Sequence, residues 1–265
     1  MWTTLFSGTA LCLVLLSQTV ETRACDSGDS QQSPTPTPTP PGSSNQVFTA
    51  RDGARFRVDT VTSDLEIPWS LAFTPDGRLF VTERPGRVRI VNLTSFTSEV
   101  ALTLGGVFAQ GEAGLLGITL DPGFAQNRFV YLYYSATSGG RAVNRIERYR
   151  EVGGRLGEPA AILDGIPAAT IHDGGRLKFG PDGLVYATAG DANNTSLSQD
   201  VSSLAGKFLR ITSTGSSATG NRFGSPVFTF GHRNPQGFDW HPATGDLWAS
   251  EHGANGNDEI NVIQS

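Results

Sequence analysis

From residue 47 onward, apolar and polar residues alternate over short stretches, and each stretch is bounded by Gly, Pro, Asp or Asn. Alternation over about four to eight residues is typical of half-buried strands. Long stretches with helical periodicity are scarce in the same region. The sequence therefore predicts an all-β domain over residues 47–265.

One arrangement of strand and turn recurs along this domain. Each copy has a strand, a turn that contains proline, and a second strand that ends in small or polar residues. The copies are LAFTPDGRLFVTE (71–83), ITLDPGFAQNRFVYLYYS (118–135), LKFGPDGLVYATAG (177–190) and FDWHPATGDLWASE (238–251). Proline at the first central position of a turn, followed by Asp-Gly, is favourable turn chemistry. Repeats of about 40–60 residues built from short strands are typical of propeller blades with about four strands each, so we expect a β-propeller.

The fourth copy lies close to the end of the sequence. The last residues, NDEINVIQS (257–265), resemble a strand with no closing segment after it. A propeller needs a closed ring of blades. We therefore expect about four blades of a propeller that is incomplete at its C-terminus; closure by four irregular blades is the alternative.

The N-terminal segment has a different composition from the domain. Residues 3–20 are mostly apolar or small, which predicts a secretory signal peptide over residues 1–24. Two kinds of processing remain open: ordinary cleavage after Ala24, or a bacterial lipoprotein with a lipid anchor on Cys25. Residues 25–46 are rich in Thr-Pro repeats, which favour an extended linker. The expected location is the bacterial periplasm or the cell surface.

Charge and motifs exclude several classes of function. Lys and Arg total 20 against 25 Asp and Glu, and no basic stripe is present, so a nucleic-acid partner is not expected. The only cysteines, Cys12 and Cys25, precede the domain, which therefore has no disulfide. The sequence contains no CxxC, HExxH, P-loop, helix-opening GxGxxG or GxSxG motif.

Two polar clusters precede strands at places where a propeller builds its site. Glu112 lies in a glycine-rich loop, QGEAGLLG, before an apolar strand. His172 lies in IHDGGRLKFGPDG, and histidine suits general-base chemistry because it titrates near neutral pH. From the residues alone, a solvated carboxylate at Glu112 and a surface histidine at His172 remain the alternatives. Arg176 is expected to be structural and to pair with a carboxylate such as Asp191.

Two further clusters concentrate polar groups beside small residues. In GHRNPQG (231–237), Arg233 offers fixed donors for a carboxylate or an electron-rich oxygen, Asn234 adds an amide, and His232 is expected to be a packing residue. The alternative for Arg233 is a structural arginine between blades. In SEHGANGNDEIN (250–261), calcium would find backbone carbonyls and carboxylates. The residues concerned are Gly253, Ala254, Asp258 and Glu259. The alternative there is a turn with a solvated acidic pair.

Five ordered blocks resemble the soluble quinoprotein sugar dehydrogenases, which use pyrroloquinoline quinone (PQQ). The blocks are LEIPWSLAFTPDGRLFVTERPGRVRIV (65–91), GEAGLLGITLDPGF (111–124), HDGGRLKFGPDGLVYATAGD (172–191), GHRNPQGFDWHP (231–242) and SEHGANGNDEIN (250–261). The resemblance runs from about residue 57 to the end. It implies a six-bladed propeller with the cofactor at one mouth of the channel.

The resemblance also implies roles for the candidate residues. His172 would remove the hydroxyl proton at the anomeric carbon of an aldose sugar while a hydride passes from that carbon to the quinone, giving the lactone. Arg233 and Asn234 would hold the quinone, and Glu112 would lie near the sugar and the cofactor. The carbonyls of Gly253 and Ala254 would bind Ca²⁺, with the Asp258–Glu259 pair at a further calcium site.

This chain departs from the family pattern at two positions. Ala254 stands where the family usually has proline, and Ile171 stands where some members have an acidic residue before the base. The cationic residues that bind the cofactor carboxylates come from late blades of the family. Two other functions remain open: a non-catalytic calcium-binding propeller that binds sugars or partners, and a propeller lactonase. The particular sugar, the electron acceptor and the oligomeric state are not specified by the sequence.

Overall fold

The computed structural model describes residues 10–13 and 46–264, which fall into two compact units. The first unit comprises Met1–Leu65 with Val91–Ser98, and the second comprises Glu66–Ile90 with Glu99–Ser265. The expected signal peptide and linker, including Cys25, lie outside the described residues except for Ala10–Leu13. None of the helices in the described ranges has the length and apolar character needed to cross a membrane.

The first unit contains two pairs of short strands. Strand β1 (Ala10–Leu13) is antiparallel to β4 (Asp59–Ser63), and β2 (Val47–Thr49) forms a hairpin with β3 (Arg55–Arg57). The rings of Phe48 and Phe56 lie opposite each other in this hairpin and stack with their centroids 5.5 Å apart.

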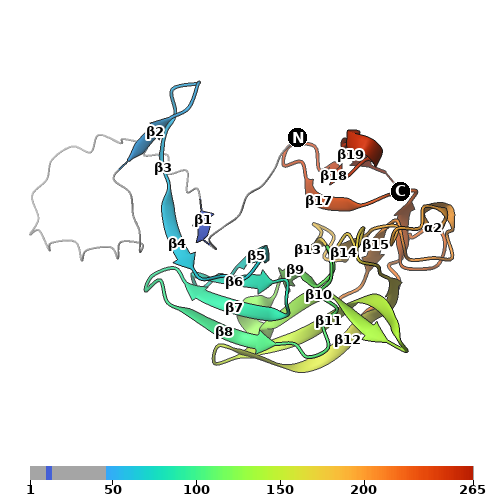
Figure 1. Ribbon diagram of the computed structural model, residues 1–265, viewed down its shortest axis with the longest axis horizontal. Coiled ribbons are helices and arrows are strands. Elements are labelled where there is room, and N and C mark those ends of the chain that lie inside the picture. The colour runs from blue at the N-terminus through green and yellow to red at the C-terminus, as the bar shows by residue number, and fades with distance from the viewer. Residues whose placement is uncertain (1–9, 14–45, 265) are drawn as a thin grey trace, which may run out of the picture. The chain divides into compact units, whose positions relative to one another are not determined.

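Four antiparallel sheets follow one another along the chain from Pro68, and each begins with the strand that lies nearest the centre of the propeller (Figure 1). The first contains β5 (Pro68–Phe73), β6 (Arg78–Glu83), β7 (Arg87–Asn92) and β8 (Ser98–Thr103). The second contains β9 (Leu115–Leu120), β10 (Phe129–Ser138), β11 (Arg141–Val152) and β12 (Arg155–Pro167). The third contains β13 (Leu177–Phe179), β14 (Val185–Ala189), β15 (Lys207–Ile211) and β16 (Val227–Phe230). The fourth contains β17 (Pro235–Trp240), β18 (Leu247–Glu251) and β19 (Glu259–Ile263).

These sheets are the blades of a β-propeller, as the sequence predicted. Pro75, Pro122, Pro181 and Pro242 all lie between the first and second strands of their blades. Helix α1 (Phe124–Asn127) is part of the second of these turns, α2 (Ser196–Gln199) follows β14, and the 3₁₀ turn η1 (Ala254–Gly256) follows β18. The proline-containing repeat therefore marks the innermost hairpin of each blade.

Hydrophobic contacts between adjacent blades make up the core. Strand β10 shows how one strand serves two interfaces: Val130 and Leu132 pack toward the first blade, whereas Tyr131 and Tyr133 pack toward the third. A third cluster, centred on Phe208 and Phe238, joins the third and fourth blades. Strands buried on both faces need apolar residues at consecutive positions, which explains the run FVYLYY at the start of β10.

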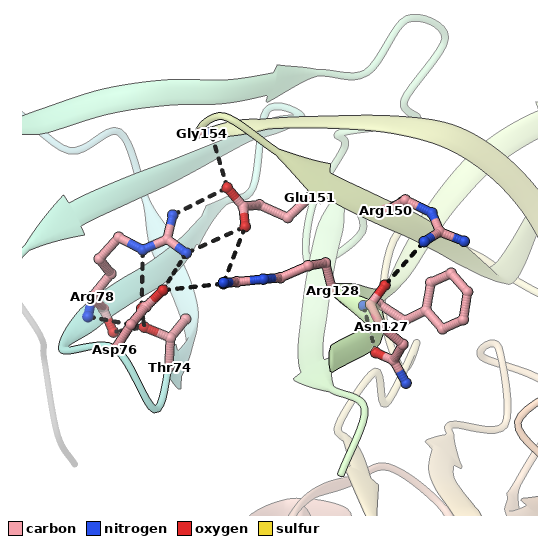
Figure 2. A network of polar contacts seen from close by, with 9 residues as sticks. Thr74, Asp76, Arg78, Asn127, Arg128, Arg150, Glu151 and Gly154 are labelled. Carbon is pink, nitrogen blue, oxygen red and sulfur yellow. Dashed lines mark hydrogen bonds and ion pairs between the residues drawn. The ribbon is translucent and has the colours of Figure 1, made fainter. Parts of the chain in front are cut away.

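An ion cluster joins the first two blades at their proline-turn end (Figure 2). Arg78 of β6 binds Asp76 at 2.8 Å and both carboxylate oxygens of Glu151 of β11, at 3.1 and 3.2 Å. Arg128, which ends α1, lies 3.1 Å from Asp76 and 3.6 Å from Glu151. The Glu151 carboxylate is only 5% exposed. Burial opposes its ionisation, but the hydrogen bonds from Arg78 and from the Gly154 N–H outweigh burial and lower its pKa.

Candidate functional site

The candidate residues gather at the end of the propeller opposite to the proline turns. Glu112, His172 and Arg233 lie in the loops that lead into β9, β13 and β17, the innermost strands of three blades. The second strand of each blade is antiparallel to the first. It therefore ends beside these loops, so that β14 leads to Asp191 and β18 ends at Glu251.

The imidazole of His172 is buried and held by a carboxylate. Its Nδ1 lies 2.8 Å from Oδ1 of Asp191, and the same oxygen accepts the N–H of Asn193 at 2.8 Å. Because Asp191 accepts, Nδ1 carries the proton and Nε2 keeps its lone pair. The backbone fits this contact closely: a Cβ on Gly190 would lie 2.0 Å from the carbonyl oxygen of His172. The imidazole of His172 is thus held in a fixed orientation by Asp191.

Glu112 connects two of the other candidates. Its Oε2 accepts the backbone N–H of His172 at 2.9 Å and the Nδ2 amide of Asn234 at 3.3 Å. The Oδ1 of Asn234 accepts the N–H of Gly174 at 3.1 Å. Asn234 is 1% exposed. The loops of the second, third and fourth blades are therefore joined through these side chains.

Glu251 fixes the turn that contains Arg233. One carboxylate oxygen accepts the backbone N–H groups of Arg233 and, at 3.2 Å, of Asn234, and the other lies 2.9 Å from Nδ1 of His232. Burial opposes ionisation of Glu251, but these hydrogen bonds, that from His232 foremost, outweigh burial and lower its pKa. The ring of His232 packs edge-on against Phe208 at 5.0 Å, as expected of a packing residue.

Arg233 presents its guanidinium at the same end of the propeller. Its carbonyl accepts the N–H of Asp191 at 2.7 Å, so Asp191 contacts both His172 and Arg233. Its Nη1 donates to the carbonyl of His252 at 3.0 Å. The guanidinium makes no ion pair within the described residues, which leaves most of its five N–H donors for a ligand.

The residues expected to bind calcium form a tight turn after β18. The N–H of Gly253 donates to Oδ1 of Asp258 at 3.2 Å, and His252 Nδ1 lies 3.6 Å from the same oxygen. The carbonyl of Ala254 accepts the Nδ2 of Asn257 at 3.1 Å. Glu259 starts β19 opposite Glu251. Among the described residues, no group of three or more His, Cys, Asp or Glu side chains is placed to hold a metal by itself.

A cavity of about 260 Å³ opens between these loops. Polar walls come from Arg84, Glu112, Asp173, Gln236 and His252, and apolar walls from Ile67, Trp69 and Leu116. Mixed walls of this kind, with a few convergent polar groups, are typical of small-molecule sites.

The family model of glucose/sorbosone dehydrogenases matches residues 65–265. The chain belongs to the glucose/sorbosone dehydrogenase family. The match includes every loop of the candidate site, from Glu112 to Glu259.

Several proteins to which the chain is similar are sugar dehydrogenases. The chain is 31% identical over 223 residues to an aldose sugar dehydrogenase of Escherichia coli K12, covering 80% of this chain and 60% of that protein. It is 29% identical over 250 residues to quinoprotein glucose dehydrogenase B of Acinetobacter calcoaceticus, covering 82% and 52%. The solved PQQ-bound aldose sugar dehydrogenase of Streptomyces coelicolor is 40% identical with a TM-score of 0.72, covering 85% and 66%. The chain thus spans between 52% and 66% of the length of these three proteins.

One predicted contact in this family member was wrong. Arg176 does not pair with Asp191: it donates to the carbonyl of Gln236 at 3.0 Å and to Ser70 Oγ at 3.2 Å, and it lies over the ring of Trp69 at 4.3 Å. Burial without a carboxylate lowers its pKa. Arg176 is therefore structural, as expected, but its partners are carbonyl, hydroxyl and aromatic groups.

Sequence reasoning missed Asp191 and Glu251 as parts of the site. Both come at the end of a blade's second strand, in ATAGD and WASE, where the repeat already ends in polar residues. The first blade has Glu83 at the same place, in FVTE, where Arg87 and Arg89 bind it at 2.8 and 3.0 Å. Alignment of the repeats was therefore the signal that could have identified the carboxylates that hold the site.

Proposed function

We propose that this chain is a PQQ-dependent aldose sugar dehydrogenase that oxidises the anomeric hydroxyl of its substrate to the lactone. The observation that supports this most directly is Asp191, which contacts the imidazole of His172 and the backbone of Arg233 at once. A base and a free cation are thereby held on neighbouring blades. A binding module without chemistry has no need of a base oriented in this way.

His172 would act as the general base. A sugar hydroxyl that approaches Nε2 transfers its proton there, and the positive charge that forms on the ring is stabilised by the Asp191 carboxylate on the other nitrogen. Glu112, bound to the backbone of His172, lies beside the same position and can accept hydrogen bonds from further sugar hydroxyls. These groups would orient the anomeric carbon for loss of a hydride.

PQQ, when bound, supplies the quinone carbonyl that accepts the hydride. The residues of this chain fit such a group in donor chemistry. The guanidinium of Arg233 has donors to spare for electron-rich oxygens, and a permanent positive charge suits an anion. Asn234 is already engaged with Glu112 and Gly174, so its part would be to hold the loop around the cofactor rather than to contact it alone.

The turn after β18 fits calcium only in part. Backbone carbonyls and a carboxylate are the donor types that calcium takes, and the turn offers the carbonyls of Gly253 and Ala254 beside Asp258. Six to eight oxygens, roughly, complete a calcium shell, so oxygens from a cofactor or from water would have to supply the rest. Asp258 and Glu259 as a second calcium site stay a prediction.

Reconstitution of the full chain with PQQ tests the proposed function. Adding PQQ and Ca²⁺ should produce a new absorption band, and an aldose such as glucose should then reduce an artificial dye acceptor. Sugar binding without turnover would favour a non-catalytic propeller, and lactone hydrolysis without PQQ would favour a lactonase; either result would overturn the proposal. The natural electron acceptor, the location outside the cytoplasm and a lipid anchor on Cys25 stay predictions.

A further inference from the structure

Asp173 follows the proposed base directly and is, like Asp191, almost completely buried. It is 1% exposed. Its Oδ1 accepts the Nδ2 of Asn144 at 3.0 Å and the N–H of Ala169 at 3.2 Å. Its Oδ2 is buried and has no partner among the described residues. No Lys or Arg pairs with it there.

A buried polar chain holds this carboxylate in place. The hydroxyl of Tyr133 donates to the Asp173 carbonyl at 3.1 Å, and Ser135 Oγ donates to Asn144 Oδ1 at 2.6 Å. Ser135 Oγ in turn accepts the N–H of Gly114 at 3.3 Å. Asn144 and Ser135 are both fully buried. Because every link is fixed by the second blade, Asp173 cannot easily turn away from the site.

The charges that face Asp173 come from three elements. Glu112, in the loop before β9, repels its negative charge, and His172 attracts it. Arg84, just after β6, lines the same cavity. Burial is the largest influence and, with repulsion by Glu112, raises the pKa of Asp173 to about 6, despite the hydrogen bonds from Asn144 and Ala169. The group is therefore mostly ionised at neutral pH but is not stabilised by a cation of its own.

An ionised Asp173 carboxylate, buried without a cation of its own, destabilises the folded state. Since its folded pKa of about 6 lies above the ordinary value of 3.8, folding favours the protonated form. The free energy of unfolding therefore falls as the pH rises from about 4 through about 6, and this contribution is constant at higher pH. An asparagine would fill the same space without that loss. A residue that weakens the fold beside a reactive group points to a functional role.

We propose that Asp173 is a positioning residue that acts through His172. Its buried carboxylate supplies a second negative charge beside the imidazole, after that of Asp191, and favours the protonated ring that forms when the sugar hydroxyl loses its proton. This inference rests on the base role proposed above for His172. Asp173 itself does not take up the proton and need not touch the sugar.

The variant Asp173→Asn removes the charge and keeps the shape. In the cofactor-free protein, the midpoint of the His172 ring titration, followed by NMR, should move to lower pH by about one unit, as expected when an opposite charge nearby is lost. In the enzyme loaded with PQQ, the acid limb of kcat/KM should move in the same direction, and kcat at the plateau should fall. A structural role alone would move neither titration. Unchanged titration of His172 in Asp173→Asn would overturn the inference.

A second measurement tests whether the charge of Asp173 destabilises the folded state. Relative to Asp173→Asn, the unfolding equilibrium constant of the wild type should rise about 100-fold between about pH 3.5 and pH 7, since each pH unit of pKa difference corresponds to about a tenfold change. If Asp173→Asn does not fold, Asp173→Ser, which is smaller and also neutral, should show the same shift of the His172 titration. Asp164→Asn, at a carboxylate that is 49% exposed, is the control and should change neither property.

The two proposals fail in different ways. If the wild type binds PQQ but oxidises no sugar, the proposed function fails, whereas the titration of His172 in the cofactor-free protein still tests the effect of Asp173. If sugar oxidation is present and Asp173→Asn has the pH profile of the wild type, the proposed function stands and the inference about Asp173 is overturned.

Discussion

Nδ1 of His172 and Oδ1 of Asp191 lie 2.8 Å apart, although one residue precedes the innermost strand of the third blade and the other follows its second strand. The contact joins the two residues across the open end of the β13–β14 hairpin. The pairing of these two strands therefore sets the distance between the imidazole and the carboxylate. Orientation of the imidazole is therefore a property of the blade rather than of the loop.

Asp191→Asn should disable the proposed base while leaving the cofactor site in place. An amide can donate to Nδ1, which would favour the tautomer with its proton on Nε2, where the base must be free. We expect kcat to fall about 100-fold or more, the usual range for loss of general-base catalysis. The PQQ dissociation constant, measured by absorbance titration, should change less than about threefold. An unchanged kcat would show that His172 does not depend on Asp191.

Arg233→Gln should weaken binding of PQQ. Hydrogen bonds from a charged donor contribute about 1.5–3 kcal/mol, so the dissociation constant should rise about tenfold or more. Arg222→Gln, at an exposed arginine, is the matched control and should bind PQQ like the wild type. Equal PQQ affinity of Arg233→Gln and the control would indicate that Arg233 only supports the turn held by Glu251.

Glu151→Gln should destabilise the propeller at neutral pH. The change leaves Arg78 and Arg128 without a buried counter-charge, and breaking such a pair costs about 3–5 kcal/mol. Glu158→Gln breaks an ion pair with Arg150 in which both side chains are exposed, and should cost less than about 1 kcal/mol. Denaturant unfolding of both variants at pH 7 measures the difference.

The difference in stability between the wild type and Glu151→Gln should depend on pH. The folded state lowers the pKa of Glu151, so its stabilisation is complete above the unfolded value of about 4.5 and is lost as the pH falls through the lower, folded value. Wild type and Glu151→Gln should therefore begin to converge in stability as the pH falls below about 4.5. A constant difference down to about pH 3 would contradict an electrostatic role for the cluster.

Gly253→Ala should disrupt the turn proposed to bind calcium. A Cβ at this position would lie 1.6 Å from the carbonyl oxygen of Asn257, so the backbone would have to move. We expect Ca²⁺, measured by calorimetry in the presence of PQQ, to bind about tenfold more weakly or not at all. Gly105→Ala, where a Cβ would meet no atom within 4 Å, is the control. If chelation of calcium leaves PQQ affinity unchanged in the wild type, the calcium assignment is wrong.

The blade repeats could be read from the sequence because the signal is local. Each proline turn and its two flanking strands are consecutive in the sequence, as Pro75 is with β5 and β6 over residues 68–83, and the rules of turn chemistry apply at that range. The positions of the loops that carry Glu112, His172 and Arg233 could be predicted from these repeats, since each loop precedes an innermost strand. The hydrogen-bond partners of these three residues could not be predicted from such local patterns.

The contacts between loops depend on how blades pack, which no local pattern specifies. Arg176 and Asp191 have opposite charges, yet Arg176 lies over the ring of Trp69 and Asp191 contacts His172. Glu251, at the end of β18, binds three groups of the turn that precedes β17. These contacts exist only when β17 and β18 are paired. Repeat alignment gives the position of such carboxylates, but only the fold gives their partners.

The proline turns lie at the end of the propeller opposite to its mouth, and all three residues of one of them, Pro181–Gly183, are exposed. The domain carries no thiol after Cys25, so a cysteine introduced at this turn would be the single point for attaching the domain to a solid support. Immobilisation through that point would leave the opposite end, with its imidazole and guanidinium, facing the surrounding solution.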